Sequence, residues 1–452
     1  MNKRQGFSSS LGMIMATAGS AVGVGNIWRF PYILGEYGGA AFLIVYLLMV
    51  LLIGIPLMVT EMAIGRMGRE DASKSFKKIA PNTKWYLSGF LGILAAFIIL
   101  GYYSVVAGWT LKYIVNSLTG VFNSGLTPEK TTTLFNNFVS SGLEPILYTF
   151  VFMAITMFIV YKGIEGGIEK ASKTLLPILA IILVILAIRS LTLPGAYKGV
   201  EFLLKPDFKA FFQKKDAILV AMGHAFYSLS LGMGILITFG SYMSQKDDLS
   251  DVAVKIAITD TIIAVLAGFV IFPAVFSFGL APSQGPGLVF VSLPNVFGNM
   301  FGGKIFSALF FTLLAFSALT STISLLETVV SYFIDSLGLK RSHATLLSGG
   351  LIFIICIFSS LSMGSHLGSF RVFGKSFFDF LDYITANVFL LVAAFVEVVF
   401  MGWFFKKNKF VEEITELGLD KNPLTDLIYN SIKFIIPVVI VVLFIANNGL
   451  IK

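Results

Sequence analysis

Long apolar runs recur along the whole chain and are separated by short polar stretches. A helix needs about 20 apolar residues to cross the roughly 30 Å hydrocarbon core of a bilayer. The pattern therefore predicts an all-α membrane protein with eleven transmembrane helices. They are expected at 10–34, 40–65, 86–116, 146–162, 173–192, 217–242, 253–279, 303–335, 343–360, 377–404 and 425–446.

The first run is interrupted between Gly19 and Pro31 by three glycines, an asparagine, an arginine and a proline. Glycine weakens a helix by roughly 0.5–1 kcal/mol relative to alanine, and proline by about 3 kcal/mol. Because freed backbone groups are costly in hydrocarbon, such a break is tolerated where it is buried in protein or lines a polar cavity. Its carbonyls can bind a cation and its amides a carboxylate. The break predicts an ion and substrate site inside the bilayer.

The sixth run repeats this pattern, with two serines and two glycines between 228 and 234. Runs one and six are five spans apart, so successive blocks of five helices enter the membrane with opposite topology. This is typical of an inverted repeat with its site where the two halves meet. The expected organisation is a single transporter domain at 1–452, with a first repeat at 10–192 (helices 1–5), a second at 217–404 (helices 6–10) and an extra helix at 425–446.

Polar side chains also lie deep in other runs. Asp260 is in span seven, and a lone carboxylate at that depth is a functional-site hypothesis by default. Hydroxyls at Ser317, Thr320 and Ser321 share one face of span eight and can supply oxygen ligands to a hard cation. The glutamates near the ends of spans two and ten, Glu61 and Glu397, are interpreted as helix-capping or inter-helix hydrogen-bonding groups.

Composition and charge agree with a membrane protein. Residues are 56% hydrophobic and 13% charged, against about 25% charged in soluble domains. Lysines and arginines gather at 66–84, 162–173 and 406–409, on the side of Lys3 and Arg4, which the positive-inside rule makes cytoplasmic; the lysine-rich connection after span five is an exception. We expect a multi-pass inner (plasma) membrane protein with its N-terminus in the cytoplasm and its C-terminus outside. Anionic membrane lipid accounts for much of the net charge of +8, and neither nucleic acid nor an obligatory protein partner is expected.

Several other chemistries are excluded. The single cysteine, Cys356, rules out an intramolecular disulfide and a thiolate metal cluster, and the three histidines are too scattered for a metal site. The chain has no His-Glu-x-x-His, no paired aspartates on facing helices and no Gly-x-Ser-x-Gly, so an enzyme is not expected and no catalytic residue is assigned. A channel needs a continuous polar pore, whereas the polar groups here cluster at two breaks.

Five motifs carry a resemblance to a known family. They are Ala21-Val22-Gly23-Val24-Gly25-Asn26 continuing to Arg29-Phe30-Pro31, Gly54-Ile55-Pro56-Leu57 with Glu61 and Gly65-Arg66, Tyr102-Tyr103 with Trp109, Ser228-Leu229-Ser230-Leu231-Gly232, and Leu319-Thr320-Ser321. Over essentially the whole chain, the sequence resembles the neurotransmitter:sodium symporter family, and within it the bacterial eleven-helix hydrophobic amino-acid transporters similar to the bacterial leucine transporter. The resemblance implies that helices 1 and 6 are unwound at mid-membrane.

The resemblance implies two Na+ sites. The first is expected to use the Ala21 carbonyl, Asn26, Ser228 and Asp260. The second is expected to use the carbonyls of Gly19, Val22 and Ser317 and the hydroxyls of Thr320 and Ser321. Such oxygen ligands suit an alkali cation and do not suit zinc or copper.

The resemblance also implies an amino-acid pocket. The residues expected to bind substrate are Ala21, Val24, Gly25, Ile99, Tyr103, Tyr227, Ser228, Ser230, Met233, Ser321 and Leu325. No acidic side chain lines the side-chain end, which disfavours a substrate with a second ammonium group. Met233 is unbranched and adaptable, which favours large hydrophobic and aromatic side chains.

Gates on both sides follow from the same resemblance. The outer gate is expected to pair Arg29 with Asp382 above Tyr103 and Tyr227, and the inner gate to pair Arg4 with Asp335 beside Tyr242 and Phe7. Gly167 and Pro177 match a family pattern for unwinding the cytoplasmic end of span five, and an ordinary helix start fits them equally well.

These features predict a sodium-coupled secondary active symporter that imports hydrophobic and aromatic L-amino acids by alternating access. Many relatives carry asparagine at Asp260, and Ala264 stands where the chloride-binding members have a serine, so chloride is not expected to be required. One alternative is a proton-coupled amino-acid transporter of the same fold, with Asp260 as proton carrier. Another is a non-transporting amino-acid sensor.

Overall fold

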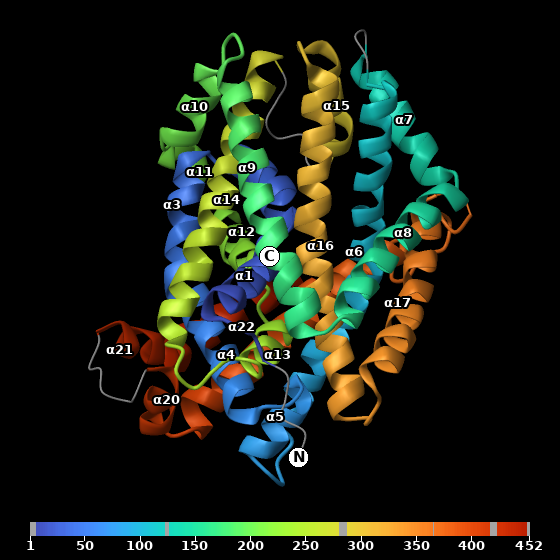
Figure 1. The fold of residues 1–452 in the computed structure, drawn as a ribbon. Coiled ribbons are helices and arrows are strands. Elements are labelled where there is room, and N and C mark those ends of the chain that lie inside the picture. The colour runs from blue at the N-terminus through green and yellow to red at the C-terminus, as the bar shows by residue number, and fades with distance from the viewer. Residues whose placement is uncertain (1–5, 123–125, 280–286, 365, 416–422, 450–452) are drawn as a thin grey trace.

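The computed structural model describes residues 6–122, 126–279, 287–364, 366–415 and 423–449 (Figure 1). In these ranges the chain folds into helices, and no strand is found. The reason is the apolar sequence itself, because a segment in hydrocarbon must satisfy its own backbone hydrogen bonds and a helix does so within one segment. The predicted all-α membrane architecture is confirmed.

Nine helices of the described residues are long and apolar enough to cross a membrane. They are Ala40–Gly68 (α3, Ala40–Met49, continuing to α4, Ile55–Gly68), Tyr86–Thr119 (α6), Leu143–Tyr161 (α8), Ile164–Leu191 (π-helical turn η3, Ile164–Glu169, then α9, Lys170–Leu191), Leu249–Ser277 (α14), Gly303–Asp335 (α16), Arg341–Met363 (α17), Phe377–Phe404 (including α18, Phe377–Ile384, and α19, Leu390–Val399) and Leu424–Asn447 (ending in α22, Ile436–Asn447).

The two runs with interrupting glycines are built differently from these nine. The first consists of α1 (Ser10–Ala21), a π-helical turn η1 (Gly25–Arg29) and α2 (Phe30–Glu36), with a 50° bend between its halves. The other consists of α12 (Ala217–Ser228) and α13 (Ile235–Gly240), separated by residues 229–234. These elements occupy the predicted runs 10–34 and 217–242.

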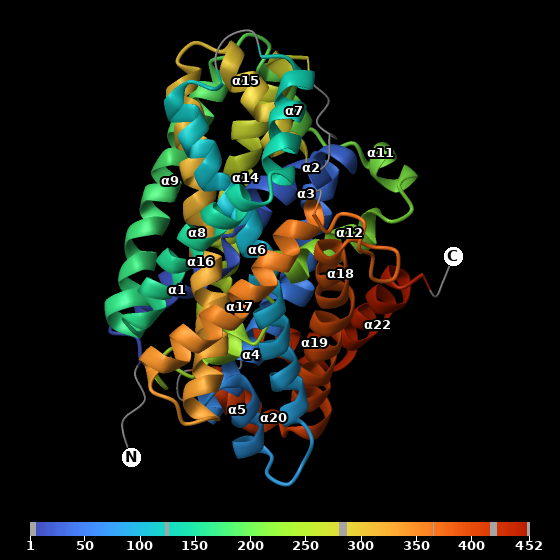
Figure 2. The same cartoon turned by 90° about the vertical axis from the view of Figure 1, so that its right-hand side faces the viewer.

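Short helices connect the long ones and were not predicted from the sequence. They are α5 (Ala72–Ile79), α7 (Pro128–Ser140), α10 (Tyr197–Leu204), α11 (Phe208–Gln213), α15 (Leu293–Asn299) and α20 (Lys407–Ile414). Figures 1 and 2 show α5 and α20 at one end of the molecule and α7, α10, α11 and α15 at the other. They escaped prediction because they are short and mostly amphipathic, and local caps start several of them. The Asp71 carboxylate, for example, accepts hydrogen bonds from the Ser73 and Lys74 N–H groups at the start of α5.

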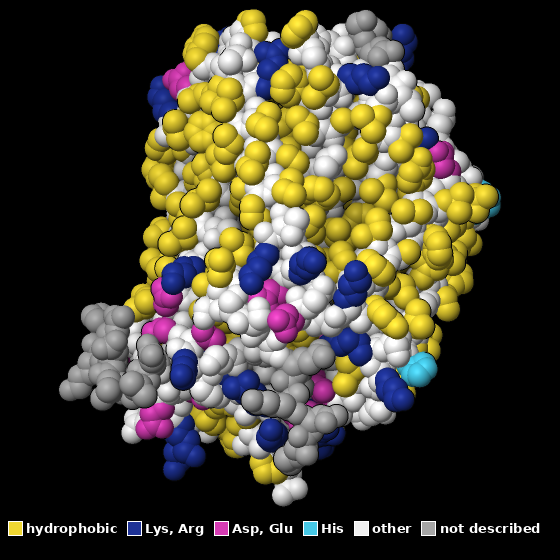
Figure 3. Space-filling view, in the orientation of Figure 1, with side chains coloured by type: hydrophobic (Ala, Val, Ile, Leu, Met, Phe, Trp, Pro, Cys, Tyr) yellow, Lys and Arg dark blue, Asp and Glu magenta, His cyan; other side chains and the backbone are white. Residues whose placement is uncertain are grey.

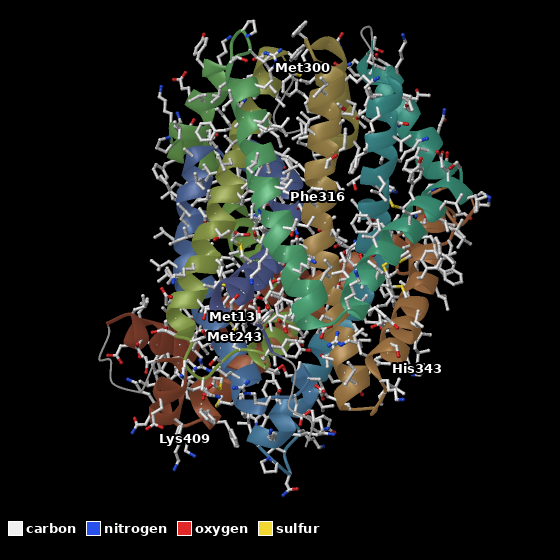
Figure 4. The ribbon with its side chains drawn as sticks, in the orientation of Figure 1. Met13, Met243, Met300, Phe316, His343 and Lys409 are labelled. Atoms are coloured by element: carbon white, nitrogen blue, oxygen red, sulfur yellow. The ribbon has the colours of Figure 1, made fainter. Side chains whose placement is uncertain are left out.

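The molecular surface shows where the bilayer lies. Figure 3 shows a broad hydrophobic band, with most of the lysines, arginines and acidic residues above and below it. Figure 4 places His343 and Lys409 toward the end that carries α5, and Met300 at the opposite end. The cationic connections at 66–84 and 406–409 therefore share one end of the molecule, as the sequence predicted. Which end faces the cytoplasm stays a prediction.

The broken spans lie inside the bundle. The first half of span one, α1, packs against α9, α14 and α16, whereas α12 packs against α3, and α13 against α4. Every residue from Ala16 to Ile27 is buried. The backbone that the breaks expose is therefore enclosed by protein, which is the condition for an irregular segment at membrane depth.

Candidate functional site

The break in span one frees backbone amides that side chains then satisfy. Helix α1 ends at Ala21, and the Val22 N–H still donates to the Ala18 carbonyl (2.8 Å). Beyond it, the Gly23 N–H donates to Oδ1 of Asn26 (3.1 Å), and the Val24 N–H donates to the Tyr103 hydroxyl (3.2 Å). The Asn26 amide oxygen and the Tyr103 hydroxyl thus accept the hydrogen bonds of two backbone amides that have no partner within the helix.

The break in span six depends on left-handed backbone. Ser230, Gly232 and Gly234 have φ of 56°, 73° and 68°, a region that glycine enters at little cost. The Gly232 N–H donates to Oε1 of the buried Glu61 (2.8 Å), which makes Glu61 the inter-helix hydrogen-bonding group that the sequence indicated. Glu397 is also fully buried and interacts electrostatically with Glu61.

A hydrogen bond joins the two breaks directly. The Ser230 hydroxyl donates to the Ser20 carbonyl (2.8 Å), and the Ser321 hydroxyl lies 3.5 Å from the same oxygen. Three segments that are far apart in the sequence therefore meet at one carbonyl. Sequence reasoning missed Ser20, although it lies within the interrupted segment, because nothing in the pattern shows which carbonyl of the break faces span six.

Asp260 lies at the centre of the first predicted ion site. Its carboxylate accepts hydrogen bonds from Nδ2 of Asn26 (2.7 Å), from the Ser228 hydroxyl (3.1 Å to each oxygen) and from the Tyr46 hydroxyl (3.0 Å). Asp260, Asn26 and Tyr46 have no exposed surface, and Ser228 is 3% exposed. All three donors are neutral, and no Lys, Arg or His side chain in the described part of the chain forms an ion pair with this carboxylate. A buried, uncompensated negative charge of this kind is costly, so the cluster is suited to a cation.

Residues of the second predicted ion site also lie close together. The Thr320 hydroxyl lies 3.3 Å from the Val22 carbonyl and donates to the Ser317 carbonyl (2.9 Å). The Ser321 hydroxyl lies 3.4 Å from that same carbonyl. A Cβ added at Gly19 would lie 3.4 Å from Cβ of Thr320, so α1 and α16 approach closely here. Carbonyl and hydroxyl oxygens from the two helices converge, and this donor set suits a hard cation such as Na+.

A cavity lies between the two breaks, α6 and α16. It is lined by Ser20, Ala21, Gly23, Gly25, Asn26, Ile99, Tyr103, Tyr227, Ser228, Ser230, Met233, Ile235, Ser321 and Leu325, and its water-accessible space is about 30 Å³. All the predicted substrate-binding residues line it except Val24. One end presents backbone amides and hydroxyls, whereas Ile99, Met233 and Leu325 give the other end an apolar surface. Such a cavity accepts a small molecule with a polar end and an apolar end.

The outer gate residues lie near each other without a direct ion pair. The Arg29 guanidinium lies over the Tyr227 ring, 5.1 Å from its centroid. Arg29 interacts electrostatically with Asp382, although the two described side chains form no salt bridge. Asp382 also lines a surface pocket with Arg371, Lys375 and Asp379. The predicted outer ion pair is therefore not formed in this structure, and its role as a gate stays a prediction.

The inner gate is described only in part, because Arg4 lies outside the described residues. Phe7 packs edge-to-face on Phe239 (5.8 Å between centroids) and Tyr242 (6.1 Å), which agrees with its expected place at this entrance. The Tyr242 hydroxyl donates to Glu327 (2.7 Å), whose two oxygens are held by the Arg341 guanidinium at 2.7 and 2.9 Å. The sequence analysis did not single out this ion pair, in which Glu327 is buried and Arg341 partly buried, since its partners are 14 residues apart on two helices.

Asp71 lies at the same end of the molecule, outside the membrane-spanning helices. It accepts a hydrogen bond from the Ser336 hydroxyl (2.6 Å) in addition to capping α5. Burial raises the pKa of this carboxyl above its ordinary value. The contact fixes the connection between spans two and three against the end of α16, where the predicted gate residue Asp335 also lies.

The start of span five is tied to the residues before α1. Gly163 has φ of 88°, and a π-helical turn, Ile164–Glu169, precedes α9. The buried Glu169 carboxylate accepts hydrogen bonds from the Ser8 N–H (2.7 Å), the Ser8 hydroxyl (2.6 Å) and the Ser9 hydroxyl (3.1 Å), and pairs with Lys173 (2.6 Å). Sequence reasoning left open whether Gly167 and Pro177 mark an unwound or an ordinary helix start. It missed this contact, because its partners are about 160 residues apart.

Comparison with known proteins agrees with this geometry. The family model "Sodium:neurotransmitter symporter family" matches residues 4–131 and 141–450. The chain belongs to this family. It is 38% identical over 457 residues to an uncharacterized sodium-dependent transporter of Haemophilus influenzae, with 98% of each chain covered. It is 37% identical over 446 residues to the uncharacterized sodium-dependent transporter YhdH of Bacillus subtilis, covering 99% of this chain and 98% of that one.

A solved structure is similar over the whole symporter fold. The crystal structure of MhsT in complex with L-phenylalanine matches with a TM-score of 0.90 and 42% sequence identity, covering 98% of this chain and 100% of that one. The chain is thus a membrane transporter of a sodium-dependent family, and it is not an enzyme. The comparisons confirm the family, the fold class and the transport function that the sequence predicted.

Proposed function

We propose that this symporter imports hydrophobic and aromatic L-amino acids together with sodium by alternating access. The observation that carries the proposal is the Asp260 carboxylate, which is fully buried among three neutral donors and lies beside the two broken helices. A cation that enters this cluster removes the cost of the buried charge. The family's dependence on sodium supports Na+ as that cation.

The two Na+ sites are proposed where the oxygen atoms converge. The first ion is held by the Ala21 carbonyl, Asn26, Ser228 and Asp260, and its bonds replace the donor contacts that the carboxylate now receives. The second ion lies between α1 and α16, held by the carbonyls of Gly19, Val22 and Ser317 and by the hydroxyls of Thr320 and Ser321. Each ion thereby links a broken helix to an unbroken one, so that binding stabilises a particular arrangement of the helices.

The amino acid is proposed to bind in the cavity between the breaks. Its carboxylate faces the amides near Gly25 and the Tyr103 hydroxyl, and its ammonium faces the Ala21 and Tyr227 carbonyls. Its side chain lies against Ile99, Met233 and Leu325. The cavity is narrow, so a large side chain displaces part of the lining, and the flexible thioether of Met233 can move at low cost. The phenylalanine bound to the similar protein MhsT supports this substrate class.

Alternating access is proposed to follow from opening one gate at a time. Outside, Arg29 and Asp382 pair over Tyr103 and Tyr227; inside, Arg4 and Asp335 pair beside Tyr242 and Phe7. Modest pair energies suit gates that must open repeatedly. Moving one elementary charge through 100 mV is worth about 2.3 kcal/mol, so two sodium ions could sustain a substrate gradient of roughly a thousandfold.

The membrane arrangement is proposed from the same reasoning. Helices of 10–192 and 217–404 form two inverted repeats around the cavity, and the helix at 425–446 packs outside them. The end that carries α5 and α20 faces the cytoplasm, as its lysines indicate, in the inner (plasma) membrane. Membrane lipid is the surrounding partner, and no obligatory protein partner is needed.

Transport is proposed to be independent of chloride. Asp260 supplies a fixed negative charge beside the first ion site, and the buried Ala264 lies one helical turn further along α14 without a hydroxyl to bind an anion. Replacement of chloride by gluconate at constant sodium tests this directly. A twofold or greater fall in initial uptake rate would contradict it.

The whole proposal is tested by uptake of radiolabelled tyrosine, tryptophan and leucine into proteoliposomes. An inward sodium gradient should drive concentrative uptake, whereas potassium or a pH gradient alone should not. Uptake driven by protons without sodium would replace the proposal by proton coupling through Asp260. Saturable binding without uptake would replace it by an amino-acid sensor.

A further inference from the structure

A separate groove lies on the outside of the helix bundle, away from the ion and substrate cavity. It runs between the start of α6 and the middle of α19 and has a volume of about 400 Å³. Lys84 and Trp85 form one end of it, and Leu91, Val392 and Val396 continue it along the two helices. The groove joins a helix of the first proposed repeat to a helix of the second.

The walls of the groove are suited to an acyl chain. Leu87 is 51% exposed and Val392 is 36% exposed, so apolar side chains face outward within membrane-spanning helices. The hydroxyl of Ser88, which also lines the groove, donates to the Ala393 carbonyl (3.0 Å). The Ser88 hydroxyl is therefore already hydrogen-bonded within the protein, and the rest of the groove wall along α6 and α19 is made of apolar side chains.

The mouth of the groove is cationic. Residues 69–85 contain five lysines and arginines against two acids, and both acids are engaged, Asp71 by the helix cap and Ser336, and Glu70 by Lys74 (3.8 Å). The Lys84 side chain forms no hydrogen bond, ion pair or aromatic contact with any described residue, so its ammonium is available at the mouth of the groove. The Lys77 ammonium lies 4.5 Å from the centroid of the Tyr86 ring, so a second positive charge is close to the same helix start.

We propose that this groove binds one anionic phospholipid, with an acyl chain along α6 and α19 and its phosphate at Lys84. A basic residue beside an apolar groove at the membrane surface is complementary to a lipid of net negative charge. Because indole rings favour the membrane–water interface, Trp85 indicates that this end of the groove lies at the level of the lipid headgroups. A second copy of the chain is not the occupant, because a stable dimer buries about 1,200 Å² or more, far more than this narrow groove offers.

Trp85 provides the probe for the test, because it lines the groove. Of the four tryptophans, Trp109 is buried, Trp28 and Trp85 are partly buried, and Trp403 is exposed. Replacing Trp403 by phenylalanine removes the most exposed indole and leaves Trp85 as the tryptophan that lines the groove. The W403F protein is reconstituted in vesicles that contain increasing fractions of brominated phosphatidylglycerol or brominated phosphatidylcholine, and quenching of its fluorescence is recorded. One lysine near an anionic headgroup contributes about a fivefold preference, so half-quenching is expected at about a fivefold lower fraction of phosphatidylglycerol.

Matched variants decide between this site and general surface charge. Lys84→Gln should abolish the preference, whereas Lys304→Gln, an exposed lysine at the start of α16, should leave it unchanged. Val392→Phe should fill the groove and reduce quenching by both lipids, whereas Val438→Phe on the exposed face of α22 should not. Equal half-quenching by the two lipids in the unmodified groove would overturn the proposal. So would an equal loss of preference in the Lys84 and Lys304 variants.

Discussion

The breaks in spans one and six both contain glycines, but the glycines have different structural roles in the two breaks. In span six, Gly232 and Gly234 have left-handed φ values, and so does Ser230 between the helices. In span one, neither Gly23 nor Gly25 is left-handed. A Cβ added at Gly23 would instead lie 2.8 Å from the Ser321 hydroxyl, and one added at Gly25 would lie 3.6 Å from the Tyr227 ring. The glycines of span one provide space, whereas those of span six provide left-handed backbone, to which Gly232 adds close packing against the Leu390 carbonyl.

Because of this difference, we expect the glycines of the two breaks to affect different properties of the protein. Span one resumes a helical path within three residues and is bent by 50°, so its glycines keep the surface close to the cavity free of side chains. Span six leaves the helix for six residues, 229–234, and a side chain of another span, Glu61, holds its freed amide. Substitutions of the glycines in span six should therefore act on folding, and substitutions of the glycines in span one on binding.

The largest effect is expected for Gly232→Ala. An alanine at φ of 73° costs about 1–2 kcal/mol in backbone energy, and its Cβ would run into the Leu390 carbonyl of α19, which cannot move aside easily. The yield of folded protein and the thermal unfolding temperature in detergent should both fall. Gly223→Ala, in the same span on α12 with no atom within 4 Å of an added Cβ, should fold normally. An unfolding temperature unchanged by Gly232→Ala would show that this break does not depend on conformation.

The next effect is expected for Asp260→Asn, which removes the charge that faces both breaks but keeps the size of the side chain. The attraction between Na+ and a carboxylate is stronger than that between Na+ and a neutral amide, so apparent sodium affinity should fall by roughly ten- to a hundredfold. Thermal stability without sodium should stay equal or rise, because an uncompensated buried charge disappears. Sodium-dependent binding of labelled substrate measures the first quantity, and a melting curve in potassium measures the second. Sodium affinity equal to that of the unaltered protein would remove Asp260 from the ion site.

Much of the fold and of the site could be predicted because the signals are local. Run length locates the spans, and the glycines and proline around Asn26 locate one break. Hydroxyls at i, i+3 and i+4 locate the face of α16 that is proposed to bind an ion. The resemblance to a family then assigned roles to these residues. The cavity contains nearly all of the predicted substrate-binding residues, because each lies in or opposite a break.

What was missed depends on tertiary contacts that no local pattern encodes. Tyr46 lies 214 residues before Asp260, and Ser8 lies 161 residues before Glu169. A single tyrosine in an apolar run gives no sign that its hydroxyl meets a carboxylate on another span. Arg341 and Glu327 likewise pair across a helix connection, and only the packing of α16 against α17 brings them together.

A smaller effect is expected for Glu61→Ala, which removes the side-chain hydrogen-bond acceptor of the Gly232 N–H in span six. The Gly232 N–H then loses its partner in a buried place, which costs about 1–3 kcal/mol. Glu61→Gln is the matched control, since its amide oxygen can still accept this hydrogen bond. Thermal unfolding should therefore rank the alanine variant well below the glutamine variant. If both variants lose the same stability, the hydrogen bond to Gly232 is not what Glu61 contributes to the stability of span six.

The smallest effect is expected for Gly25→Ala, and it completes the comparison. The added methyl group would make an ordinary contact, 3.6 Å from the Tyr227 ring, at a φ that alanine adopts readily, so the unfolding temperature should stay within about one or two degrees of the unaltered protein. The methyl narrows the cavity at its polar end, so KM should rise several-fold for tyrosine and tryptophan alike, since both present the same carboxylate there. Uptake kinetics with the two substrates provide the measurement. A loss of stability as large as that of Gly232→Ala would mean that span one also needs glycine for its backbone, and the distinction between the two breaks would fail.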